Sequence, residues 1–289
     1  METTYLMLAY VAGLLGVLFW LLFKTKQERE RPVKSEKMLR GAGHSLSVKI
    51  ERRTEKLFLR VILIVCLPLA VLLFGGSFLS DALQGWNFAA WLGGMVGLGA
   101  LLAWFLSFRI KSLANESLGL QGERLVGETL NWLMKDGYGV FHDYPIEPDG
   151  KSGNVDHVVV GPNGVFAIET KAVRKPKEAP EGKNYEVMFD GKRLKYPHFT
   201  TKKGGIGQAT QNARLLAKHL SSSIDELVEV VPILTLPGWF VESQSSHPLL
   251  VLNPKVIRGV ILRRDACIDE SLQKKISYQL ELRCRDVEF

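Results

Sequence analysis

The 289-residue sequence contains few of the residues that build disulfide scaffolds or metal clusters. It has three cysteines, none of them in a Cys-x-x-Cys pair, and its six histidines show no metal-binding spacing. No glycine-rich loop has the spacing of a Walker-type phosphate-binding motif. These absences argue against a disulfide framework, a structural zinc site and a P-loop enzyme, and they favour a reducing compartment.

Charge is missing over long stretches of the first 108 residues. Three runs without a charged residue have lengths of 19, 20 and 27 residues and cover 5–23, 61–80 and 82–108. Because about 20 apolar residues in a helix span a bilayer, the sequence predicts three transmembrane α-helices, at about 5–23, 61–80 and 86–108. Gly93 and Gly97 form a GxxxG pattern, which fits packing among these helices or an oligomer formed through them.

Basic residues predict the orientation of this membrane region, residues 1–108. The loop 24–56 carries 11 Lys and Arg against 5 acids, whereas 76–87 carries a single acid. The positive-inside rule then places the loop and residues 109–289 in the cytoplasm. The first run could instead be a signal peptide, but it lacks a positive start and a cleavage site. The chain is therefore expected to be a multi-pass protein of the inner (cytoplasmic) cell membrane, in contact with the lipid bilayer.

Helical and strand patterns alternate in the remaining 109–289 region. The periodicity predicts a helix at 118–135, strands at 138–144, 154–160 and 165–171, a helix at 206–220, strands at 229–236 and 248–252, and helices at 256–261 and 270–282. A basic, polar stretch at 172–205 holds at most a minor strand pair near 185–194. This order predicts an α+β or α/β fold, with a mixed sheet flanked by helices.

A hairpin brings two carboxylates together. The Gly-Pro-Asn-Gly turn pairs Val160 with Val165, so Asp156 lies directly opposite Glu169 on the same face of the sheet. Lys171 follows Glu169 by two residues and shares that face. The hairpin therefore collects two carboxylates and an ammonium group at one end of an otherwise apolar surface.

Two close carboxylates repel each other unless a cation lies between them. Converging carboxylate oxygens suit a hard divalent ion such as Mg²⁺, which binds one or two carboxylates together with water and substrate phosphates. The lysine could hold the attacking water or face a phosphate oxygen. The alternative is an exposed hairpin with an ordinary cross-strand ion pair. His157 faces the opposite side from these acids and is predicted to be a core or second-face histidine.

The stretch from residue 119 to about 220 resembles the nuclease-related domain (NERD) family of the PD-(D/E)XK nuclease superfamily. The matching residues, in the family's order, are Gly119-Leu-Gln-Gly-Glu123, Val155-Asp-His-Val-Val-Val-Gly-Pro-Asn-Gly164, Phe166-Ala-Ile-Glu-Thr-Lys171 and Gln208-Ala-Thr-Gln-Asn212. Val155 replaces the superfamily's proline. The resemblance implies a restriction-endonuclease-like fold with a motif core at 117–220, and Mg²⁺-dependent (or Mn²⁺-dependent) hydrolysis of nucleic acid.

The resemblance also implies a role for each matching polar residue. Asp156 and Glu169 would be metal ligands, Lys171 would position or activate water, Glu123 would be an additional acidic ligand, and Gln208 would border the site. The residues support Glu123 independently, because it continues the apolar face of its helix toward the sheet. A first-turn glutamate favoured by the helix dipole is the alternative.

A basic stretch beside this site suits a phosphate backbone. Residues 171–203 hold 10 Lys and Arg against 4 acids, with aromatic residues interleaved. The alternative is a solvated loop. The residues predicted to bind nucleic acid are Arg174, Lys175, Lys177, Lys192 and Arg193.

Together these patterns predict a membrane-anchored, Mg²⁺-dependent nuclease-like protein that hydrolyses phosphodiester bonds, with DNA favoured over RNA. A different class of function fits the same residues: a non-catalytic, membrane-tethered nucleic-acid-binding or scaffold module with a nuclease-like fold. Action on a phosphate-bearing lipid or small molecule is a third reading. An enzyme needs the metal and Lys171 for turnover, whereas a binding module needs only the basic stretch.

Overall fold

The computed structural model describes residue 13 and residues 37–78, 86–147, 150, 152–177, 183–202, 204–243 and 247–287. The chain divides into two compact units. The first unit comprises Met1–Lys34 and Glu51–Ala114, and the second comprises Ser35–Ile50 and Asn115–Phe289. Apart from residue 13, the apolar run at 5–23 lies outside the described residues.

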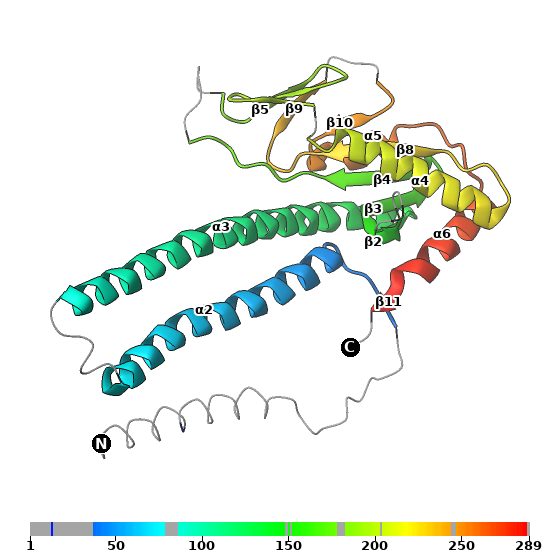
Figure 1. Cartoon of the computed structure of the whole chain (residues 1–289). Helices are drawn as coiled ribbons and strands as arrows, with labels where there is room; N and C mark the ends of the chain where they lie inside the picture. Colours follow the sequence, from blue (N-terminus) through cyan, green and yellow to red (C-terminus); the bar gives the residue numbers. More distant parts are fainter. Residues whose placement is uncertain are drawn as a thin grey trace. The chain divides into compact units, whose positions relative to one another are not determined.

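Two long helices pass from one unit into the other. They are α2 (His44–Phe78) and α3 (Trp86–Asn131) (Figure 1). The helix predicted to begin at residue 118 is the last part of α3, because no proline interrupts the chain between its ends. Over the described ranges, no helix combines the length and apolarity needed to cross a membrane, and the spans predicted at 61–80 and 86–108 are not supported.

The second unit is built around a five-stranded sheet in the order β10-β8-β4-β3-β2. Its strands are β2 (Gly139–Ile146), β3 (Gly153–Gly161), β4 (Gly164–Thr170), β8 (Val230–Thr235) and β10 (Leu250–Leu252). β2, β3 and β4 are antiparallel, whereas β4, β8 and β10 run parallel. The predicted mixed sheet is confirmed. β2 continues through Pro145 because it is an edge strand, where a missing N–H costs no ladder bond.

Helices cover both faces of this sheet, because its strands alternate apolar side chains between two cores. One core joins Val158, Val160, Val165 and Ala167 to α4 (Ile206–Ile224) and α6 (Glu270–Cys284). The other joins Val159, Phe166 and Ile168 to the end of α3, the 3-10 helix η1 (Trp132–Asp136) and α5 (Pro254–Leu262). α4 crosses the sheet over β4 and β8 (Figure 1). The helices predicted at 206–220, 256–261 and 270–282 are confirmed, in that order.

The described parts of the basic stretch contribute three strands to a second, four-stranded sheet in the order β7-β6-β5-β9. Its strands are β5 (Glu186–Phe189), β6 (Leu194–Lys195), β7 (Thr200–Thr201) and β9 (Phe240–Ser243). The strand pair predicted near 185–194 is present, and β9 joins β5 in parallel from beyond the family motifs. A separate core containing Phe189, Leu194 and Trp239 holds this sheet together.

The segment before α2 belongs to the second unit. β1 (Met38–Leu39) pairs antiparallel with β11 (Arg285–Val287), close to the C-terminus. The backbone N–H of Arg40 donates to the carbonyl of Cys284 at 2.9 Å. The sequence predicted only a basic loop here, because charge patterns do not show a pairing partner more than 240 residues away.

Candidate metal-binding site

The hairpin has the register that the sequence predicts. Val160 pairs with Val165 and His157 pairs with Ile168, and the next positions along the two strands are Asp156 and Glu169. Both carboxylates are buried, with 5% and 3% of their surface exposed. Buried carboxylates need partners, so their contacts decide what the site can do.

Each of the two acids is held by one neutral donor. The backbone N–H of Thr170 donates to Oδ2 of Asp156 at 2.7 Å. Asn212 on α4 donates through Nδ2 to Oε2 of Glu169 at 3.1 Å, and to the carbonyl of Asn154 at 3.2 Å. These bonds orient the carboxylates without neutralising their charge.

Glu123 on α3 is a third buried acid at this place, with 9% of its surface exposed. Its Oε2 has no hydrogen-bond partner among the described residues. Burial and the nearby Asp156 and Asp143 raise the pKa of Glu123 to about 8, against the opposing effect of Lys171. A buried carboxylate oxygen without a donor is costly, which suggests a ligand that binds there.

Burial has the same effect on the two hairpin acids. It raises the pKa of Asp156 to about 7, with a further rise from Asp143 and opposing effects from the Thr170 N–H and Lys171. Burial, and then the charge of Asp156, raise the pKa of Glu169 well above its ordinary value. The three acids therefore cannot all ionise at neutral pH unless additional positive charge reaches them.

A divalent cation would supply that charge. Within the described part of the chain, however, no group of three or more His, Cys, Asp or Glu side chains is arranged to hold one ion together. The structure thus brings Asp156 and Glu169 into register. Glu123 is near them, but the three carboxylates are not arranged to bind one ion together. Two carboxylates fit Mg²⁺, which takes its remaining ligands from water and substrate.

Lys171 and Gln208, the other predicted site residues, differ in their surroundings. Lys171 follows β4 directly, its backbone N–H bonds the Thr235 carbonyl at 2.9 Å, and its charge acts on all three acids. Gln208 is exposed on the first turn of α4. Asn212, one helical turn later, is the residue that reaches Glu169. The sequence signal that could have identified Asn212 is its i, i+4 spacing from Gln208, which places both residues on the same side of the helix.

Asp143 on β2 is a further acid of the site that sequence reasoning missed. It is fully buried and has a left-handed backbone, with φ of 53°. It occupies the position opposite Asp156, between the His142–His157 and Tyr144–Val155 pairs of the β2–β3 ladder. A lone aspartate in a predicted strand carries no local signal of such a position.

The histidine prediction is confirmed. His157 is fully buried on the face opposite to the acids, and its Nδ1 lies 2.9 Å from Nδ1 of His142. Burial lowers the pKa of His142 to about 4 and that of His157 well below its ordinary value. Both imidazoles are thus neutral in the folded protein and add no cation to the site.

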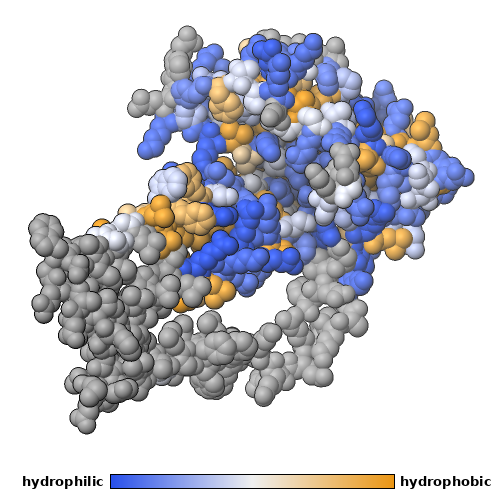
Figure 2. All heavy atoms as spheres, viewed as in Figure 1, coloured by the Kyte–Doolittle hydropathy of each residue, from blue (hydrophilic) through white to orange (hydrophobic). Residues whose placement is uncertain are grey.

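The five predicted nucleic-acid-binding residues are all exposed. Arg174, Lys175 and Lys177 follow β4, and Lys175 Nζ lies 5.7 Å from the centre of the Trp239 ring. Lys192 and Arg193 form the turn between β5 and β6, where both backbone N–H groups donate to Asp190. Much of the surface of the second unit seen in Figure 2 is hydrophilic, with separate hydrophobic patches.

Comparison with known proteins finds one family match, over part of the chain. Residues 118–237 match the model of the nuclease-related domain family. The match includes Glu123, Asp143, Asp156, Glu169 and Lys171, and it ends just after β8. No curated protein and no solved structure matches the chain. The resemblance to a nuclease-related domain is thereby confirmed for this part of the chain.

Proposed function

We propose that the second unit is a Mg²⁺-dependent (or Mn²⁺-dependent) nuclease that hydrolyses phosphodiester bonds of nucleic acid, with DNA favoured. One observation carries the proposal: two buried carboxylates in register, with raised pKa values and a lysine beside them, lie within the stretch that matches a nuclease-related domain. Such a cluster is unfavourable for a purely structural role and fits a cation-binding one.

Each residue would have a defined task in this reaction. Asp156 and Glu169 would hold the metal, which supplies Lewis-acid polarisation of the phosphoryl oxygen and an acidified water. The Thr170 N–H and Asn212 would fix the two carboxylates. Lys171 would orient the attacking water or face a phosphate oxygen, and Glu123 would act from the edge of the site, with Gln208 bordering it.

The exposed basic residues would bind the phosphate backbone beside the site. Arg174, Lys175 and Lys177 support this proposal because they leave β4 directly after Lys171, so a strand held by them passes close to the acids. Lys192 and Arg193 would extend the contact along the smaller sheet.

Membrane anchoring through residues 1–108, with the second unit in the cytoplasm, is part of the proposal. Its support is in the sequence, in three uncharged runs and a basic loop between the first two. Extraction of membranes with alkaline carbonate tests the anchoring, which predicts retention in the pellet. A reporter fused after Phe289 tests the orientation, and activity found only outside the cytoplasm would overturn it.

The central test uses the full-length protein in detergent, wild type beside Asp156→Ala. Labelled single- and double-stranded DNA and RNA are incubated with Mg²⁺, Mn²⁺ or EDTA. Glu270→Gln is the matched control, because it removes an exposed carboxylate that pairs with Lys274 along its own helix. Metal-dependent cleavage by wild type and control, but not by Asp156→Ala, is expected. Intact binding without cleavage in any variant would instead identify a tethered binding module.

A further inference from the structure

The backbone of Asp143 is unusual for a residue in a strand. Its φ of 53° is in the left-handed region, which non-glycine residues seldom adopt. Such conformations persist only where the surroundings hold them, and they gather at functional sites. Here the distortion occurs on β2 directly across from Asp156, so it places a fourth acid next to the proposed metal ligands.

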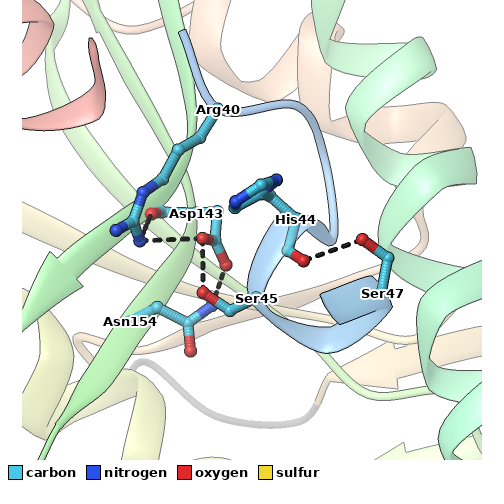
Figure 3. A network of polar contacts seen from close by, with 6 residues as sticks. All are labelled: Arg40, His44, Ser45, Ser47, Asp143 and Asn154. Carbon is cyan, nitrogen blue, oxygen red and sulfur yellow. Dashed lines mark hydrogen bonds and ion pairs between the residues drawn. The ribbon is translucent and has the colours of Figure 1, made fainter. Parts of the chain in front are cut away.

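The hydrogen bonds that Asp143 accepts hold it in one orientation (Figure 3). Arg40 donates through Nη1 to Oδ2 at 2.9 Å and to the main-chain carbonyl at 3.1 Å. Ser45 donates to the same Oδ2 at 2.6 Å, and Asn154 donates to Oδ1 at 2.8 Å. Both carboxylate oxygens are therefore engaged, and the charge is compensated by a guanidinium.

Two of these partners come from a segment outside the family match, residues 40–47. Gly43 has φ of 73°, and a Cβ there would lie 2.4 Å from Leu120 and 3.4 Å from Oε2 of Glu123. At Gly127, likewise, a Cβ would meet Ala42 at 2.6 Å. The segment therefore packs closely on α3 beside Glu123, and glycine is required on both sides of this contact.

We propose that Arg40 and Ser45 are positioning residues of the metal site, which keep the Asp143 carboxylate bonded away from the metal that Asp156 and Glu169 hold. The inference rests on the proposed function and concerns the residues that determine the geometry of that site. Without Arg40, Asp143 is a buried anion with no compensating guanidinium beside two acids. A divalent ion at Asp156 and Glu169 then offers it a counter-charge, so Asp143 competes for the metal and displaces it from the reactive position.

This arrangement predicts a particular set of kinetic and binding effects. Arg40→Gln lowers the cleavage rate at saturating Mg²⁺ by about tenfold or more, the range seen when the outer partners of metal ligands are changed. The same variant binds Mn²⁺ as tightly as wild type or more tightly, because negative charge is uncovered. Asp143→Asn in the Arg40→Gln background removes that charge and restores the rate to within about threefold of wild type.

The experiment uses the full-length protein and measures Mn²⁺ affinity by electron paramagnetic resonance, cleavage rate against Mg²⁺ concentration, and thermal unfolding. Arg258→Gln is the matched control, since Arg258 makes a two-bond pair with Asp136 on the surface. Ser45→Ala removes one bond to the same oxygen and gives a smaller loss of rate, which keeps the test valid if Arg40→Gln does not fold.

The outcomes separate this inference from the proposed function. A wild-type protein that neither cleaves nor binds Mn²⁺ overturns both. A wild-type protein that cleaves, with Arg40→Gln and Ser45→Ala cleaving equally well, overturns the inference alone. An Arg40→Gln rate that Asp143→Asn does not restore also overturns it, because the loss would then come from general destabilisation.

Discussion

Two buried polar clusters lie on opposite faces of β3, one residue apart in the chain. Asp156 shares its face with Glu169, and its charge also acts on Glu123, whereas His157 faces His142. Burial disfavours charge in both clusters, raising the pKa values of the acids and lowering those of the histidines. The same physical cause therefore has opposite consequences at neutral pH.

The histidines respond to burial by being neutral, which is close to their ordinary state at pH 7. The acids cannot do so without taking up protons that unfolded carboxyl groups lack at that pH. The neutral histidine pair can therefore stay buried at little cost, whereas the acid cluster needs additional positive charge before its carboxyl groups can ionise. This difference, rather than burial itself, marks one face of β3 as a candidate site.

The largest expected effect comes from removing the groups that act on the substrate. Glu169→Gln or Lys171→Ala should lower metal-dependent cleavage by about 10²–10³-fold, as when a single stabilising group is removed from an active site. Binding of nucleic acid to the basic stretch should persist. His142→Asn, on the other face, should leave the rate within about twofold; a comparable loss there would remove the distinction between the faces.

Asn212→Ala should have the next largest effect, about 10–100-fold on the cleavage rate and on Mn²⁺ affinity. Its Nδ2 is the donor that holds Glu169, and the two residues are 43 positions apart. Gln211→Ala is the control, because Gln211 is exposed on the same helix. Equal rates for both variants would show that Glu169 is oriented by other means.

Stability should fall as pH rises from 6.5 to 8 in the absence of divalent metal. The folded pKa values of Glu123 and Asp156, about 8 and 7, lie above their ordinary values, so the folded state holds more protons than the unfolded state in this window. His142 and His157 have lowered pKa values, so the unfolded state still holds part of their protons near pH 6.5, and they oppose this trend only at the lower end of the window.

Thermal unfolding with and without Mg²⁺ checks this sign. The melting temperature in EDTA should decrease across the window, and the increase caused by Mg²⁺ should be larger at pH 8 than at pH 6.5, because metal replaces the protons. In Glu169→Gln the increase in melting temperature caused by Mg²⁺ should be smaller than in wild type. A melting temperature in EDTA that rises with pH would contradict the raised carboxyl pKa values.

The smallest effect is expected from the surface. Replacing Lys192 and Arg193 together by Gln should reduce the slope of log binding constant against log salt concentration by about 1–2, since each phosphate contact contributes about 0.9 for duplex DNA. The cleavage rate at saturating substrate should stay unchanged. Lys274→Gln is the control, because its ammonium pairs with Glu270 within α6.

Sequence reasoning succeeded where the determining interactions are local. The Gly-Pro-Asn-Gly turn sets the β3–β4 register within a few residues, so the position of Asp156 opposite Glu169 could be derived before any fold was known. Helices α4 and α5 follow from their own apolar periodicity in the same way.

Long-range contacts were out of reach for the same reason. Arg40 and Asp143 are 103 positions apart, and the pattern around each gives no sign of the other. Asn212 was visible within a recognised motif, but only the packing of α4 on β4 shows that it, and not Gln208, reaches Glu169. The start of α3 was missed because a single helix crosses two differently composed regions.

The pairing of β1 with β11 has a practical consequence for laboratory work on this protein. A fragment beginning near residue 112 would include the whole family match and look complete by sequence. It would nevertheless leave β11 without its partner strand β1 and expose the surface of α3 that residues 40–47 cover. It would also remove two of the hydrogen-bond donors of Asp143. An inactive fragment of this kind would report the loss of its N-terminal support, so negative results require a version that begins before Lys37.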